Sequence, residues 1–135
     1  MLVSLPEIAA IIKNCRTIAV VGLSPKENRP SNDVARYLIN AEYHVIPVNP
    51  GQNEILGQKC YPNLAAIPEP VDLVDIFRRA EEVGPVVDEA IAIKAKVVWM
   101  QQGIVNEEAA AKARKAGLHV IMDRCLKVDH ANLSK

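Results

Sequence analysis

The sequence predicts an α/β protein with a three-layer, doubly wound parallel sheet. Three observations lead to this fold class: short β-branched runs alternate with longer helical stretches, the first run breaks at a glycine before a polar loop, and no repeat or linker interrupts the pattern. Repeated strand–helix–strand units favour parallel strands joined by right-handed crossovers. The 135 residues, half of them hydrophobic, suit a single domain over 1–135 with one sizeable core.

The elements are expected in the following order. Ser4 and Glu7 have the spacing of a capping box, with Pro6 in the first turn of an N-terminal helix. Strands are then expected at residues 17–21, 43–48, 71–77, 97–100 and 119–122, and helices at 33–40, 85–94 and 107–116. Pro47 suggests that the second strand lies near an edge of the sheet or that the proline stands at its end, because proline cannot donate to a strand ladder.

The last of these helices has well-marked ends. Asn106 is a typical N-cap, Glu107 and Glu108 follow in the first turn, and Gly117 stands just after the helix.

Residues 50–70 depart from the alternation and are rich in Pro, Gly, Asn and Gln. We expect a short extra strand at Cys60–Tyr61 and about one helical turn at Leu64–Ile67. This segment follows the carboxyl end of a strand, which is where α/β sheets form their ligand crevice, so it is a candidate wall of that crevice.

Composition excludes several classes of partner. With 16 basic and 16 acidic residues the formal net charge is zero, so duplex nucleic acid is not expected. One Trp and one Phe offer no stacking surface for a single strand. No apolar run approaches the roughly 18 residues of a membrane span, and the N-terminus lacks the features of a signal peptide. Three widely separated cysteines without metal-ligand spacing favour a reducing, cytoplasmic compartment.

The loop after the first strand has the features of a phosphate-binding site. A strand, a small-residue turn and a helix start follow one another here, so backbone N–H groups at the helix start are available to an anion. The candidate residues of this loop are Gly22, Ser24, Pro25, Lys26, Arg29 and Ser31. A single exposed cation is often merely solvated. It is the combination of two cations with the serines and the glycine in one loop that indicates a nucleotide-type ligand.

NAD is disfavoured by the same loop. A dinucleotide fingerprint needs Gly-x-Gly-x-x-Gly, and the loop from Gly22 has one glycine of the three. The second strand is followed by Asn49 and Pro50, not by the acidic residue that holds a ribose diol.

Two further loops are expected at the same rim. Arg78 and Arg79 follow the third strand and could pair with phosphate, with Phe77 against a base or a pantetheine chain. The alternative is that Phe77 belongs to the core and that the arginines pair with nearby glutamates. After the fourth strand, Gln101 and Gly103 could bind a polar group of the ligand, whereas we expect Trp99 to pack in the core.

The sequence shows no catalytic constellation, so no enzyme is expected from it. His44 and His119 fall within strands, and His130 falls in a polar tail. Cys125 follows the fifth strand between cationic neighbours, which activate a thiol when they lie close to it. The alternative is an inert thiol that packs as a small hydrophobe.

Several motifs in the same order resemble the small, single-domain CoA-binding proteins, whose fold is similar to the CoA-binding domain of the succinyl-CoA synthetase α subunit. The motifs are Val20–Pro25, Arg29–Ser31, Val45–Pro50, Val74–Arg78, Val98–Gly103 and Met122–Cys125. The resemblance implies a Rossmann-type domain with coenzyme A lying across the carboxyl ends of the strands. It implies phosphate or pantetheine contacts for Gly22, Ser24 and Ser31, a pocket lining of Asn49 and Pro50, and nucleotide contacts for Phe77 and Arg78.

The leading hypothesis is a cytoplasmic module that binds CoA or a small acyl-CoA for storage, sensing or delivery and catalyses no reaction itself. A second hypothesis is a thiol redox protein in which Cys125 forms a mixed disulfide with CoA. A third is a regulatory NAD(P)-binding domain. A homodimer and an unidentified acyl-CoA enzyme both remain open as protein partners.

Overall fold

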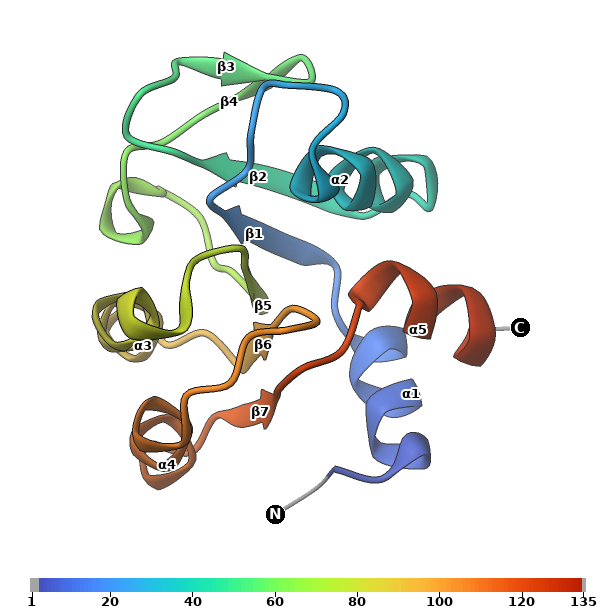
Figure 1. The fold of residues 1–135 in the computed structure, drawn as a ribbon, viewed down its shortest axis with the longest axis vertical. Helices are drawn as coiled ribbons and strands as arrows, with labels where there is room; N and C mark the ends of the chain where they lie inside the picture. Colours follow the sequence, from blue (N-terminus) through green and yellow to red (C-terminus); the bar gives the residue numbers. More distant parts are fainter. Residues whose placement is uncertain (1–2, 135) are drawn as a thin grey trace.

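The fold, described for residues 3–134 of a computed structural model, is the expected three-layer α/β arrangement. Its five parallel strands lie in the order β2-β1-β5-β6-β7 and comprise β1 (Thr17–Val21), β2 (His44–Val48), β5 (Leu73–Ile76), β6 (Val97–Met100) and β7 (His119–Ile121). One face is covered by α1 (Leu5–Asn14), α2 (Pro30–Asn40) and α5 (Leu126–Leu133), and the other by α3 (Val83–Ala92) and α4 (Glu107–Lys115) (Figure 1). Both faces of the sheet are therefore buried, as parallel strands require.

The sheet separates two hydrophobic clusters, and alternate strand residues enter one or the other. In β5, Leu73 packs with α1 and α2, whereas Val74 packs with α3 and α4. Asp75 is the exception among these side chains. It is fully buried, and neither of its carboxyl oxygens has a hydrogen-bond partner among the described residues. Burial raises the pKa of Asp75 well above its ordinary value, because the charged form is disfavoured away from water.

Several expectations for local structure are confirmed. Ser4 and Glu7 form a capping box, Asn106 caps α4, and β2 with its Pro47 is an edge strand. Residues Leu64–Ala66 form a single 3-10 turn.

Other expectations were wrong. The extra strand lies at β4 (Gln58–Lys59), paired with β3 (Glu54–Ile55), because a turn at Leu56 and Gly57 closes a hairpin there; Tyr61 makes only one bridge, to Val48. The expected helix at 33–40 begins earlier, at Pro30, a residue that fits the first turn of a helix.

The region around His130, expected to be a polar tail, is the helix α5. Its first residue, Leu126, is buried, and Arg124 forms two hydrogen bonds with the buried Asp129 that hold the helix start. These tertiary contacts stabilise a helix whose own hydrophobic pattern is weak.

The strand order places the ligand crevice. It reverses between β1 and β5, which are neighbours in the sheet but lead into helices on opposite faces. In open α/β sheets the crevice lies outside the carboxyl ends of the strands at such a switch point. The loops that follow β1 and β5 therefore flank it.

Candidate functional site

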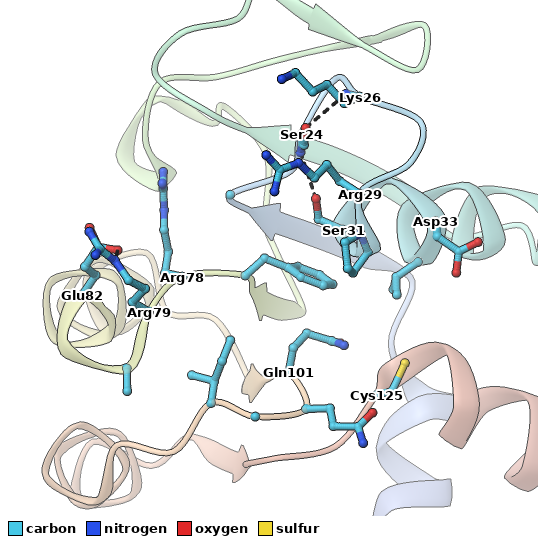
Figure 2. Close-up of a pocket in the computed structure, with 18 of the residues that line it drawn as sticks. Ser24, Lys26, Arg29, Ser31, Asp33, Arg78, Arg79, Glu82, Gln101 and Cys125 are labelled. Atoms are coloured by element: carbon cyan, nitrogen blue, oxygen red, sulfur yellow. Dashed lines mark hydrogen bonds and ion pairs between the residues drawn. The ribbon is translucent and has the colours of Figure 1, made fainter.

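An open pocket of about 1070 Å³ lies at the carboxyl ends of β1, β5 and β6 (Figure 2). It brings together most of the residues that the sequence predicted. Those that line it are Gly22, Ser24, Lys26, Arg29, Ser31, Phe77, Arg78, Arg79, Gln101, Gly103 and Cys125. The predicted residues Pro25, Asn49 and Pro50 lie outside this lining.

Gly22 is required by the close approach of two strand ends. Its φ is +86°, and a Cβ there would lie 2.2 Å from the Phe77 carbonyl oxygen. Its N–H donates to the carbonyl oxygen of Val48 at 2.9 Å, while the N–H of Phe77 donates to that of Val21 at 2.8 Å. The backbone at the switch point is thus held tightly, and no side chain separates it from the pocket.

The serines shape the loop between β1 and α2. The Ser31 hydroxyl accepts from the Ser24 N–H at 3.0 Å, and the Ser24 hydroxyl accepts from the Lys26 N–H at 3.1 Å. Asn32 donates to the Ser24 carbonyl oxygen at 2.9 Å. Each hydroxyl oxygen accepts one of these bonds, and its proton can still be donated to a ligand. The loop is therefore organised before any ligand arrives.

Asn49 braces the same loop from β2. Its side-chain amide donates to the Leu23 carbonyl oxygen at 3.0 Å, and its oxygen accepts from the Gly51 N–H at 2.9 Å. The structure thus gives Asn49 a positioning role behind the pocket wall, which sequence spacing alone did not reveal.

Three cations on the pocket wall have no carboxylate partner within residues 3–134: Lys26, Arg29 and Arg78. Arg29 precedes α2 and makes no side-chain capping bond to it, so its guanidinium is available at the positive end of that helix. Arg79 differs, because its Nε lies 3.3 Å from a Glu82 carboxylate oxygen and 3.7 Å from one of Glu81. The expected pairing with glutamate therefore applies to Arg79.

The loop after β6 forms one side of the pocket, and hydrogen bonds hold its amide groups in place. Gln101 is only 5% exposed, and its Oε1 accepts from the Leu126 N–H at 3.2 Å. Gly103 has a φ of +88°, and its N–H donates to an Asp123 carboxylate oxygen at 2.6 Å. Trp99 is fully buried, as expected, and donates to the Arg124 carbonyl oxygen at 2.8 Å.

Cys125 lines the pocket at the start of α5 and is half-buried. Its cationic neighbours are engaged elsewhere: Arg124 binds Asp129 at 2.7 and 2.8 Å, and the Lys127 Nζ lies 2.9 Å from Asp33. Cys15 and Cys60 are buried away from the pocket, and burial raises the pKa of the Cys15 thiol to about 11. All three thiols are free.

The histidines lie outside the pocket lining. His44 pairs with Glu69 at 2.8 Å, and His130 accepts or donates a hydrogen bond at 2.7 Å with the Tyr37 hydroxyl. Among the described residues no cluster of His, Cys, Asp or Glu could hold a metal ion. In the same part of the chain no helix is long and apolar enough to cross a membrane.

The sheet order, the switch-point glycine and the loop that follows it are those of a Rossmann-like α/β domain. The chain belongs to the CoA binding domain family, whose model matches residues 16–131. It is 45% identical over 125 residues to the uncharacterized protein YneT of Bacillus subtilis, with 93% of each chain covered.

The same domain is found in larger proteins. The chain is 33% identical to an ADP-forming acetate–CoA ligase of Archaeoglobus fulgidus, over 82% of this chain but 18% of the ligase. Among solved structures, a hypothetical protein from Pyrococcus horikoshii matches with a TM-score of 0.96 and 40% identity, over 98% of this chain and 94% of that one. An apo acetyl-CoA synthetase from Ca. Korarchaeum cryptofilum matches with a TM-score of 0.72 and 28% identity, over 79% and 26%. Relatives are thus standalone domains or parts of CoA ligases.

Proposed function

We propose that this pocket binds CoA or a small acyl-CoA and that the domain acts as a non-catalytic carrier or sensor. One observation carries the proposal: Lys26, Arg29 and Arg78 line the same pocket, and none of them has a carboxylate partner among the described residues. CoA has a pyrophosphate and a ribose 3′-phosphate, and binding them requires several cations and backbone N–H groups within one crevice.

The remaining lining suits the rest of the molecule. The absent side chain at Gly22 lets a phosphate approach the backbone, and Ser24 and Ser31 offer hydroxyl protons. Phe77 is half-buried against the core and forms an apolar wall for the adenine or the pantetheine arm. Pro25 and Pro50 flank this loop and its brace Asn49, so we expect them to act on the ligand through the loop backbone.

A carrier role is supported by the cations, hydroxyls and amides among the groups on the wall, which bind and orient a ligand. Three free cysteines fit a cytoplasmic, reducing compartment. Because relatives of the domain form part of CoA ligases, an acyl-CoA enzyme is the kind of partner we expect, and a homodimer is the alternative.

A second candidate function rests on the position of Cys125 in the same pocket. In this case the Cys125 thiolate attacks the disulfide of oxidised CoA, forms a mixed disulfide and releases one CoA thiol. Replacing Cys125 with Ser should abolish the covalent adduct in intact-mass spectra but leave reversible CoA binding. An adduct that persists in the variant would eliminate this role.

The proposed function is tested by calorimetric titration of the reduced protein with CoA, dephospho-CoA and NAD. We expect CoA to bind, and loss of the 3′-phosphate to weaken binding by about tenfold, the effect of one good charge-assisted contact. Binding of NAD in place of CoA would instead support a regulatory NAD(P)-binding domain and contradict the proposal.

A further inference from the structure

The two ends of the pocket differ in charge. Lys26, Arg29 and Arg78 stand at one end, where Glu81 and Glu82 pair with Arg79, and Figure 2 shows Gln101 and Cys125 at the other, near the start of α5. The nearest lysine to this second end, Lys127, is paired with Asp33 at 2.9 Å, so it is not available to a phosphate. If the phosphates of CoA occupy the cationic end, its uncharged arm extends toward Gln101 and Cys125.

Gln101 is held in one orientation. Its side chain is almost entirely buried, and its Oε1 accepts the N–H of Leu126, the first residue of α5. Because the oxygen faces this backbone donor, the amide nitrogen takes the opposite position. Figure 2 shows that nitrogen pointing into the pocket, toward the side where the Cys125 sulfur also lies. No described residue accepts a hydrogen bond from it.

The Gln101 Nε2 is open to the pocket and has no acceptor among the described residues, so a ligand that supplies an acceptor gains one hydrogen bond there. Free CoA ends in a thiol, whose sulfur is a weak acceptor. An acyl-CoA ends in a thioester, whose carbonyl oxygen is a stronger one. The end of the pocket that holds Gln101 therefore distinguishes these two ligands.

We propose that Gln101 makes this protein selective for acyl thioesters of CoA, by donating from its Nε2 to the thioester carbonyl oxygen. The inference rests on the proposed function and adds the form of ligand that the pocket prefers. The half-buried Cys125 forms the adjoining wall, against which a short acyl group such as acetyl packs. Gln101 is thus a specificity-determining residue.

The test compares acetyl-CoA with S-ethyl-CoA, a thioether of similar size that has no carbonyl oxygen, and with free CoA. We expect the protein to bind acetyl-CoA about tenfold more tightly than S-ethyl-CoA, the effect of one added hydrogen bond. Gln101→Glu keeps an oxygen for the Leu126 N–H but replaces the pocket-facing donor with an acceptor. This variant should lose the preference for acetyl-CoA.

Gln102→Glu is the matched control, because it adds the same charge one residue away on the exposed part of the same loop. We expect it to weaken all three ligands through charge and to keep the preference for acetyl-CoA. Circular dichroism checks that both variants fold.

Equal affinities of the unmodified protein for acetyl-CoA and S-ethyl-CoA would overturn the inference, whatever the variants do. A Gln101→Glu variant that weakens all ligands alike and keeps the preference would also overturn it, since Gln101 would then contact another part of the arm. If none of the three ligands binds the unmodified protein, it is the proposed function that fails.

Discussion

The charged groups at the two ends of the parallel strands differ in whether they are paired. We call the side of the sheet where the strands begin the amino edge, and the side where they end the carboxyl edge. At the amino edge, the Asp72 carboxylate accepts from the N–H groups of Arg16 and Thr17 at 2.9 and 3.0 Å, and it lies 3.5 Å from the Lys96 Nζ. At the carboxyl edge, Arg29 and Arg78 have no such partner among the described residues. Charges that satisfy one another stabilise the fold, whereas charges left unpaired around a pocket indicate a ligand of opposite sign.

The direction of the helices reinforces this contrast. In parallel α/β units each helix starts where the preceding strand ends, so the positive ends of the helix dipoles lie at the carboxyl edge. Here α2 starts at Pro30 directly behind Arg29, which adds a helix N-terminus to the unpaired cations. Anion binding is therefore expected at this edge.

The largest effect should come from Gly22→Ala, which would disrupt the carboxyl edge. The new Cβ meets the Phe77 carbonyl oxygen at 2.2 Å, so β1 and β5 must separate at the switch point. We expect a loss of about 3 kcal/mol in the free energy of unfolding, measured by urea denaturation, together with loss of CoA binding.

Gly103→Ala is the control for that change. Gly103 has a similar φ of +88°, but a Cβ there meets nothing within 4 Å. It should cost about 1 kcal/mol from backbone strain alone. Equal costs at the two positions would show that the contact with Phe77 is not what requires Gly22.

Asp75 is fully buried within β5, and its titration should make the free energy of unfolding depend on pH. Its pKa is raised by burial, so the native state keeps a proton that the unfolded state releases once the pH exceeds the ordinary value of 3.8. The native state then binds more protons, and stability falls by up to about 1.4 kcal/mol per pH unit until the raised pKa is reached.

Asp75→Asn removes this titration at nearly constant shape. Its stability relative to the unmodified protein should therefore rise as pH increases above 4, as measured by denaturation at a series of pH values. A difference between the two proteins that does not change with pH would show that Asp75 is not a neutral acid in the fold.

Asp72→Ala probes the amino edge. Burial by itself raises the pKa of Asp72. The hydrogen bonds from Thr17 and Arg16 and the nearby Lys96 together lower it by more than burial raises it, so the pKa lies below its ordinary value. The carboxylate thus stabilises the fold above the unfolded pKa, and this contribution is lost as pH falls through the folded pKa.

At pH 7 the Asp72→Ala variant should lose about 2 kcal/mol of stability, because two backbone donors lose their acceptor. CoA affinity should stay the same, since Asp72 lies at the opposite edge from the pocket. A variant that folds well but binds CoA poorly would break the separation between the two edges.

The smallest effect concerns the adjacent arginines. Arg78→Ala should weaken CoA binding by about tenfold, because among the described residues Arg78 has no carboxylate partner from which it must first be released. Arg79→Ala should change affinity much less, since Arg79 is exposed and pairs with Glu82 and Glu81. Calorimetry of the two variants compares them, and a larger loss for Arg79→Ala would reverse their assignment.

The sequence predicted the sheet and most of the pocket for a common reason. Strands buried on both faces appear as β-branched runs, and parallel strands bring the residues after their carboxyl ends to one rim. Gly22, Arg78 and Gln101 could therefore be predicted to lie near one another without any knowledge of their side-chain contacts.

The contacts that hold the site could not be predicted in this way, because they join distant residues. The bond from Leu126 that orients Gln101 spans 25 residues, and the bond from Asn49 to Leu23 spans 26. The helix α5 was missed for a similar reason, since it depends on the Arg124–Asp129 pair and on burial of Leu126 and not on a strong amphipathic pattern.

The claim that ligand binding belongs to the carboxyl edge is tested most directly by recording amide NMR spectra while CoA is added to the reduced, isotope-labelled protein. Shift changes should concentrate at residues 22–31, 77–79, 101–103 and 125, which surround the pocket. Arg16, Thr17 and Lys96 at the amino edge should keep their positions. Shift changes centred on the amino edge, or none at saturating CoA, would contradict the account.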